Sequence, residues 1–152
     1  MRINVKALLP RSGNNIIEGT RLAITNFLIY LIIGCLSYGL FKISNWIRHI
    51  GIPVPLPVWL ILFGTGIPCF IYWFQYGKAF GTFINDRRFA RGLSLGALGN
   101  LPGMAFVYIL IKGDYLSVNR ENFLIVFIMY TMLLILMPIM VILGTMDNQK
   151  RL

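Results

Sequence analysis

The stretch LAITNFLIYLIIGCLSYGLF, residues 22–41, decides the fold class of this chain. It contains no charged side chain, and most of its residues are large and apolar. A helix of about 20 such residues is long enough to cross the hydrocarbon core of a bilayer, which is about 30 Å thick. The stretch therefore predicts a membrane-spanning helix.

Three further apolar stretches have a similar length and composition: VWLILFGTGIPCFIYWFQY (58–76), GLSLGALGNLPGMAFVYILI (92–111) and FLIVFIMYTMLLILMPIMVILG (123–144). The 152-residue chain is 57% hydrophobic and 12% charged, whereas soluble domains carry about 25% charged residues. We therefore predict an all-α membrane protein, a four-transmembrane-helix bundle forming one domain over residues 22–152. Residues 1–21 are predicted to be a basic interfacial segment.

The basic residues predict how the bundle is oriented. Four Lys and Arg residues precede the first span, four lie between the second and third spans, and two follow the fourth, against two in each remaining loop. Lys and Arg accumulate on the cytoplasmic side of membrane proteins. We therefore expect a multi-pass membrane protein with both termini on the cytoplasmic side. The net charge of +9 is then matched by anionic lipid headgroups, and we expect no nucleic-acid partner.

The sequence offers no set of residues for catalysis. His49 is the only histidine, Cys35 and Cys69 are far apart in the chain, and the five acids are scattered. Nucleophilic catalysis and zinc binding both need several such groups together. No ionisable residue lies inside the four predicted spans, which argues against a proton relay. We expect no enzyme activity, no cofactor and no metal.

Small residues recur on the third span at the spacing of a helix-packing motif, at Gly92, Gly96, Gly99 and Gly103. GxxxG pairs allow two helices to approach closely in a membrane, so we predict that this face packs against another helix. Asn100 and Pro102 lie on the same span and allow two interpretations. Asn100 could hydrogen-bond to a neighbouring helix, or a helix broken at Pro102 could line a substrate path. The fourth span has few small residues, and we expect it to face lipid.

Other polar residues lie within or between the spans. Asn26 and Gln75 are intramembrane polar residues with the same two interpretations as Asn100. The loop YGKAFGTFINDRRFARG, residues 76–92, contains basic residues among phenylalanines. These residues could serve simply to set the orientation of the protein in the membrane, or they could contact anionic lipid or an acidic partner. The basic residues are Lys78, Arg87, Arg88 and Arg91.

Two functions remain open. The preferred hypothesis is a non-enzymatic interaction or assembly subunit of a membrane complex, which includes immunity-type and exclusion-type roles. It would bind another membrane protein or a second copy of itself through the first and third spans. The alternative is a small transporter or channel that works as a homo-oligomer on a neutral or uncoupled substrate, with Asn26, Asn100 and the region of Pro102 along its path.

The sequence also resembles the RDD family of small multi-span bacterial membrane proteins over roughly residues 20–152. RLAITNFLIYLI is similar to the family's first span, with Arg21 at the Arg position and Asn26 where an acid is expected. YGKAFGT resembles the family's GKxxxG element, and LSLGALGN and MDNQKRL resemble segments that follow it. The family's closing His-Asp and Ala-Gly-Thr do not occur here. The resemblance implies a multi-pass protein of a bacterial inner (cytoplasmic) membrane, with a suspected role in transport.

Overall fold

The computed structural model describes residues 8–49, 56–112 and 120–147, with side chains described mainly over 8–36, 64–109 and 131–147. Both termini lie outside the described residues. The described chain forms four helices, α1 (Asn15–His49), α2 (Leu56–Gly81), α3 (Arg88–Lys112) and α4 (Arg120–Asp147). The prediction of an all-α, four-helix protein is thus confirmed, and each predicted apolar stretch lies inside one helix.

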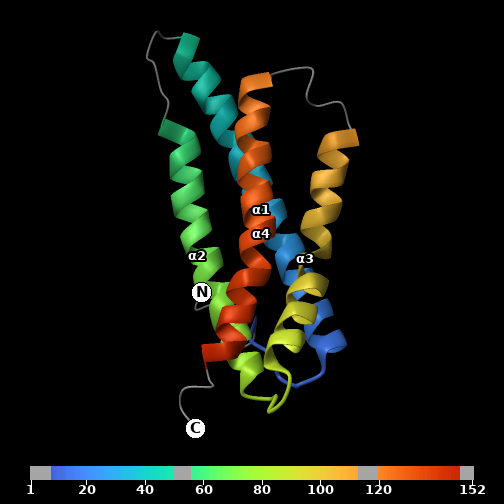
Figure 1. The fold of residues 1–152 in the computed structure, drawn as a ribbon. Coiled ribbons are helices and arrows are strands. Elements are labelled where there is room, and N and C mark those ends of the chain that lie inside the picture. Colours follow the sequence, from blue (N-terminus) through green and yellow to red (C-terminus); the bar gives the residue numbers. More distant parts are fainter. Residues whose placement is uncertain (1–7, 50–55, 113–119, 148–152) are drawn as a thin grey trace.

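The helices run alternately up and down (Figure 1). The start of α1, the end of α4 and the loop 82–87 between α2 and α3 lie together at the lower end of the view, and α1 tilts across the back of the bundle. α4 packs most extensively against α2 and α3, while α1 packs mainly against α3. We call the lower end the basic end, because it carries Arg11, Arg21, Lys78, Arg87, Arg88 and Arg91.

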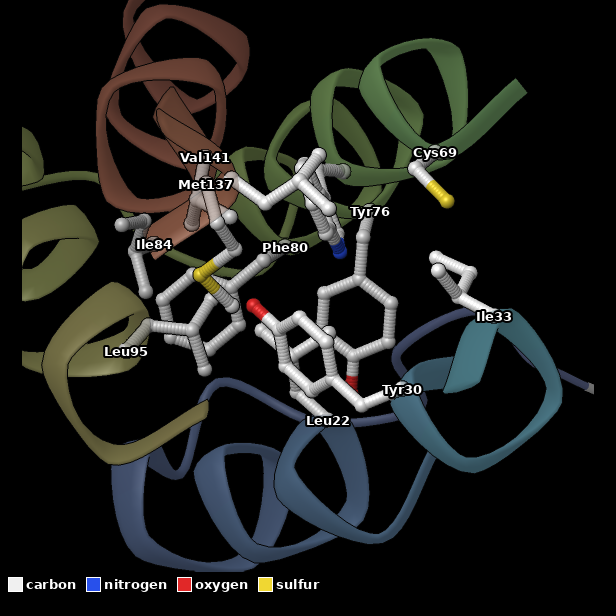
Figure 2. Close-up of a cluster of buried hydrophobic side chains, with 12 residues drawn as sticks. Leu22, Tyr30, Ile33, Cys69, Tyr76, Phe80, Ile84, Leu95, Met137 and Val141 are labelled. Atoms are coloured by element: carbon white, nitrogen blue, oxygen red, sulfur yellow. The ribbon is translucent and has the colours of Figure 1, made fainter. Parts of the chain in front are cut away.

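The core lies where one face of each helix meets the others. Figure 2 shows side chains from all four helices converging, among them Tyr30, Tyr76, Phe80 and Met137. Trp73, Tyr76 and Phe80 of α2 are all fully buried. Their spacing of three and four residues places them on one face of the helix. Large aromatic side chains therefore fill the centre of the bundle.

The expectation that the fourth span faces mainly lipid is wrong for one of its faces. Met137 and Val141 are fully buried. The small residues that allow this packing come largely from the partner helices: a Cβ on Gly77 of α2 would collide with the backbone of Val141, and one on Gly96 of α3 with Pro138. A helix rich in large residues can pack closely when its neighbours supply the glycines.

α3 continues from Arg88 to Lys112 through Pro102, so the helix is not broken there. α2 and α4 likewise contain an internal proline each. Proline removes only one intrahelical hydrogen bond, and contacts with neighbouring helices can preserve the helix around it. A path lined by two half-helices at Pro102 is therefore not part of this fold.

The outer surface of the described bundle is apolar. Two helical segments, Asn15–Leu36 and Arg88–Ile109, are long and apolar enough to cross a membrane, and Thr131–Asp147 is a shorter apolar helix. Most residues of the two longer segments are not buried. Large apolar side chains such as Ile24, Phe27 and Met104 are more than half exposed. The described helices are thus apolar on their outer faces as well as in the core.

Candidate functional site: a polar seam inside the bundle

Polar side chains lie along one buried face of α1. Glu18, Leu22, Asn26 and Tyr30 are four residues apart and are all at most 2% exposed. That spacing stacks side chains on one side of a helix. They meet polar groups of α2 and α3, and we call the whole set the polar seam, consisting of Glu18, Asn26, Tyr30, Trp73, Tyr76 and Asn100.

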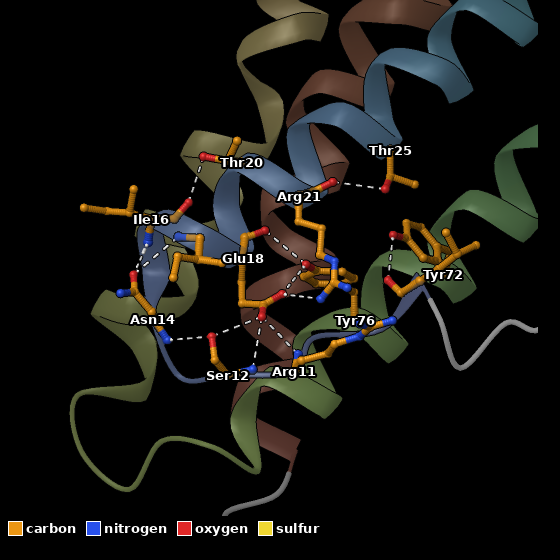
Figure 3. Close-up of polar contacts among 12 residues, drawn as sticks. Arg11, Ser12, Asn14, Ile16, Glu18, Thr20, Arg21, Thr25, Tyr72 and Tyr76 are labelled. Atoms are coloured by element: carbon orange, nitrogen blue, oxygen red, sulfur yellow. Dashed lines mark hydrogen bonds and ion pairs between the residues drawn. The ribbon is translucent and has the colours of Figure 1, made fainter.

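The carboxylate of Glu18 closes the seam at the basic end (Figure 3). Its Oε1 accepts hydrogen bonds from the backbone N–H groups of Arg11 and Ser12, both at 3.0 Å, and from the Ser12 hydroxyl at 3.1 Å. Its Oε2 accepts from the Tyr76 hydroxyl at 3.0 Å and lies 3.5 Å from the Arg21 guanidinium. Every one of these partners is a donor, a set that suits an ionised carboxylate.

Glu18 thereby fixes residues 8–14, which we call the N-terminal strap, across the end of the bundle. The Tyr72 hydroxyl donates to the Leu8 carbonyl at 3.4 Å. At the other end of the strap, the side chain of Asn14 accepts from the N–H groups of Ile16 and Ile17 and so caps the start of α1. One carboxylate therefore holds the strap through one oxygen and α2 through the other.

Asn26 connects three helices in the middle of the seam. Its Nδ2 donates to the Gly99 carbonyl of α3 at 2.7 Å, and its Oδ1 accepts from the Trp73 indole of α2 at 2.9 Å. A buried amide is costly unless both of its ends are paired. Both ends of Asn26 are paired within the chain. Its contacts are therefore those of the first interpretation, hydrogen bonds to neighbouring helices.

Asn100 connects α3 to α4 and α1. Its Nδ2 donates to the Leu134 carbonyl at 2.7 Å, and its Oδ1 accepts from the Tyr30 hydroxyl at 3.4 Å. The carbonyl of Leu134 would normally bond to the N–H of residue 138, but Pro138 has none. The amide of Asn100 thus supplies the donor that Pro138 removes, which stabilises α4 at its internal proline.

The four glycines predicted to pack against another helix contact α1 and α4 of the same chain. A Cβ on Gly96 would lie 2.9 Å from the Cα of Pro138, and one on Gly92 would lie 2.5 Å from the Thr145 hydroxyl. The corresponding atoms on Gly99 and Gly103 would meet Leu22 and Tyr30 of α1 at 2.6 and 2.8 Å. The glycine face of α3 is therefore covered by α1 and α4 of the same chain.

The remaining predicted residues lie outside the seam. Gln75 is exposed on α2. Lys78 pairs with Asp147 at 2.6 Å, and Arg91 pairs with Asp86 at 3.7 Å. Arg88 is the first residue of α3, and Arg87 directly precedes it. Arg87 is exposed and has a positive φ of 45°. The four basic residues thus share one end of the bundle without forming a single cluster of contacts.

Sequence reasoning missed Glu18, Trp73 and Tyr76. Glu18 precedes the apolar stretch and was included in the interfacial segment, although it lies eight residues before Asn26 and therefore on the same helix face. Trp73 and Tyr76 lie near the end of the second predicted span, where aromatic residues are typical of the membrane surface, whereas both are fully buried. Extending the helical spacing of Asn26 backwards would have identified Glu18 as a candidate core residue.

The contacts of the seam join the N-terminal strap and all four helices. Among the described residues, no group of three or more His, Cys, Asp or Glu side chains could hold a metal ion. The seam's described polar groups bond to one another, to the backbone, or to the side chains of Ser12 and Arg21. No known family, characterised protein or solved structure matches this chain in the comparisons made.

Proposed function

We propose that this chain is a four-span protein of a bacterial inner membrane with both termini on the cytoplasmic side. The apolar outer faces of the described helices support this, because such surfaces are stable in lipid and costly in water. The position of the basic end supports the orientation, since the loop 82–87 and both described ends of the chain lie there. Lys and Arg concentrate on the cytoplasmic side of inner-membrane proteins.

We further propose that it is a non-enzymatic interaction or assembly subunit of a membrane complex, a class that includes immunity-type and exclusion-type proteins. The observation that carries this proposal is the pairing within the polar seam. Asn26, Asn100 and Glu18 would be the residues available to bind a substrate, and each is engaged by groups of the same chain. The surface left for a partner is the outer, apolar one.

The outer faces of α1 and α3 are the best candidates for the partner surface. The glycine face of α3 is filled by α1 and α4, so a partner cannot use it without opening the bundle. On α1, the side opposite the seam carries Phe27, Leu28, Leu31 and Ile32, all more than half exposed. A helix of another membrane protein, or α1 of a second copy, would pack against these residues.

The RDD-like transporter remains the alternative function. It would use Asn26 and Asn100 along a path, but each amide is hydrogen-bonded through both its nitrogen and its oxygen, and α3 is continuous at Pro102. A path would require these hydrogen bonds to open during each cycle. The interaction subunit needs no such rearrangement, and we therefore prefer it.

Native mass spectrometry after gentle extraction into nanodiscs from the native host tests this choice. We expect a companion protein at fixed stoichiometry, which the double variant Leu28→Ala/Leu31→Ala weakens. Ile139→Ala on the outer face of α4, where the side chain is 42% exposed, is the matched control. A clean homo-oligomer that carries a solute across vesicles would instead establish the transporter.

A further inference from the structure

Three arginines at the basic end form no ion pair with an acidic residue of the described part of the chain. The described ion pairs use Arg21, Lys78 and Arg91. Among the described residues, no carboxylate lies within 4.0 Å of Arg11, Arg87 or Arg88. Arg87 and Arg88 are adjacent in sequence at the start of α3, so two arginines without an ion pair among the described residues lie at this end of the bundle.

The guanidinium of Arg88 is only partly satisfied. Its Nε donates to the Ile84 carbonyl at 3.3 Å, but its Nη1 is buried without a hydrogen-bond partner. A guanidinium carries five donors in a planar fork that fits a phosphate or carboxylate group. An outward rotation of the Arg88 side chain would let this fork pair with an anion at the surface, and would remove the cost of the buried unpaired donor.

Exposed aromatic residues flank the two arginines. Phe83 is 48% exposed and Phe89 is 58% exposed. They lie on the loop 82–87 and in the first turn of α3. Aromatic side chains next to basic ones are typical of the boundary between acyl chains and headgroups.

We propose that Phe83, Arg87, Arg88 and Phe89, which we call the headgroup patch, bind an anionic glycerophospholipid, with the arginines on its phosphate and the phenylalanines on its acyl chains. This inference rests on the membrane location proposed above and not on the existence of a protein partner. A lipid carries a phosphate group next to hydrocarbon chains, and the patch carries two arginines next to two phenylalanines. An acidic peptide would match the arginines but leave both phenylalanines exposed to water.

The test is native mass spectrometry of the purified chain in micelles that contain equal amounts of dioleoyl phosphatidylglycerol and dioleoyl phosphatidylcholine. We expect preferential retention of phosphatidylglycerol. Each Lys or Arg near an anionic surface contributes about a five-fold gain in binding, so Arg87→Gln should lower retention about five-fold and Arg87→Gln/Arg88→Gln about 25-fold. Added salt should weaken retention in the parent chain.

Lys112→Gln is the matched control, because it removes one positive charge at the opposite end of α3, where the side chain is exposed. It should leave retention unchanged. The single variant at Arg87 keeps the test valid if the double variant unfolds, since its exposed side chain makes no described contact. Equal retention of the two lipids, or equal losses in Arg87→Gln and Lys112→Gln, would overturn the proposal.

A second measurement separates this proposal from the membrane location itself. Alkaline carbonate washing of native membranes should leave both the parent chain and Arg87→Gln in the pellet, because the patch adds lipid selectivity to a chain that is already inserted. Release of the parent chain would refute the membrane location. Retention of the parent chain without any preference for phosphatidylglycerol would refute the patch alone.

Discussion

Replacing the Glu18 carboxylate by an amide should release the N-terminal strap. Glu18→Gln keeps the shape of the side chain but removes its charge and turns one acceptor into a donor. In the parent chain the two oxygens accept from Arg11, Ser12 and Tyr76 at 3.0 to 3.1 Å and lie 3.5 Å from Arg21. The new amide nitrogen would face the guanidinium of Arg21, and the strap would bond to a neutral oxygen.

The magnitude follows from the number of charge-assisted bonds that are lost. A hydrogen bond to a charged group contributes about 1 kcal/mol more than one between neutral groups. Two backbone donors and the Ser12 hydroxyl are affected on the strap, so the strap should lose about 2 to 3 kcal/mol. Tyr76 is affected less, because its hydroxyl also reaches the main-chain oxygen of Glu18 at 3.0 Å.

Hydrogen exchange of the peptide covering residues 8–14, measured by mass spectrometry in nanodiscs, reads this loss directly. A loss of 2 to 3 kcal/mol corresponds to roughly 30- to 150-fold faster exchange at Arg11 and Ser12. Asp147→Asn makes the same chemical change at the same end of the bundle, in a partly exposed pair with Lys78 that lies outside the strap and contributes on the order of 1 kcal/mol. If exchange in the strap is as slow in Glu18→Gln as in Asp147→Asn, the carboxylate does not hold the strap.

Three further predictions concern the helices themselves, each measured as the unfolding free energy in mixed micelles. Asn100→Leu should lower the unfolding free energy by about 1 to 3 kcal/mol. The loss should be smaller in a Pro138→Ala background, because alanine restores the N–H that bonds to the Leu134 carbonyl. The same loss in both backgrounds would contradict this coupling. Gly96→Leu should lower the unfolding free energy by about 3 kcal/mol or more, because the new side chain would collide with the backbone of Pro138. Gly64→Ala has open space around it and should raise the unfolding free energy by up to about 1 kcal/mol. Similar effects of the two variants would refute the close packing of α3 on α4. Arg87→Gly should gain about 1 kcal/mol by relieving the positive φ while losing phosphatidylglycerol retention, and a loss of stability would contradict it.

The four helices could be predicted because each contains a long apolar run, and such runs have few alternatives to a helix in lipid. The ends of the helices were harder to predict. α1 begins at Asn15, well before the apolar run, since Asn14 caps it and the strap packs against it. The capping signal was present in the sequence, but the strap's position depends on Tyr72 and Tyr76, far along the chain.

The polar seam was only partly predictable. Asn26 and Asn100 were recognisable as polar residues within apolar runs, but their amide nitrogens donate to backbone carbonyls of other helices, which no residue type identifies. The glycines of α3 predicted a close helix contact, but they did not indicate whether the partner helix belongs to the same chain. That choice depends on the path of the loops, and the structure places α1 and α4 there.

The most direct test of the whole account is the sidedness of the two ends of α3. In a background with Cys35→Ser and Cys69→Ala, single cysteines at Thr82 and Lys112 would be labelled in intact cells with a membrane-impermeant maleimide. The four-span bundle with a cytoplasmic basic end predicts labelling of Lys112→Cys from outside and of Thr82→Cys only after permeabilisation. Labelling of both positions from the same side would contradict it.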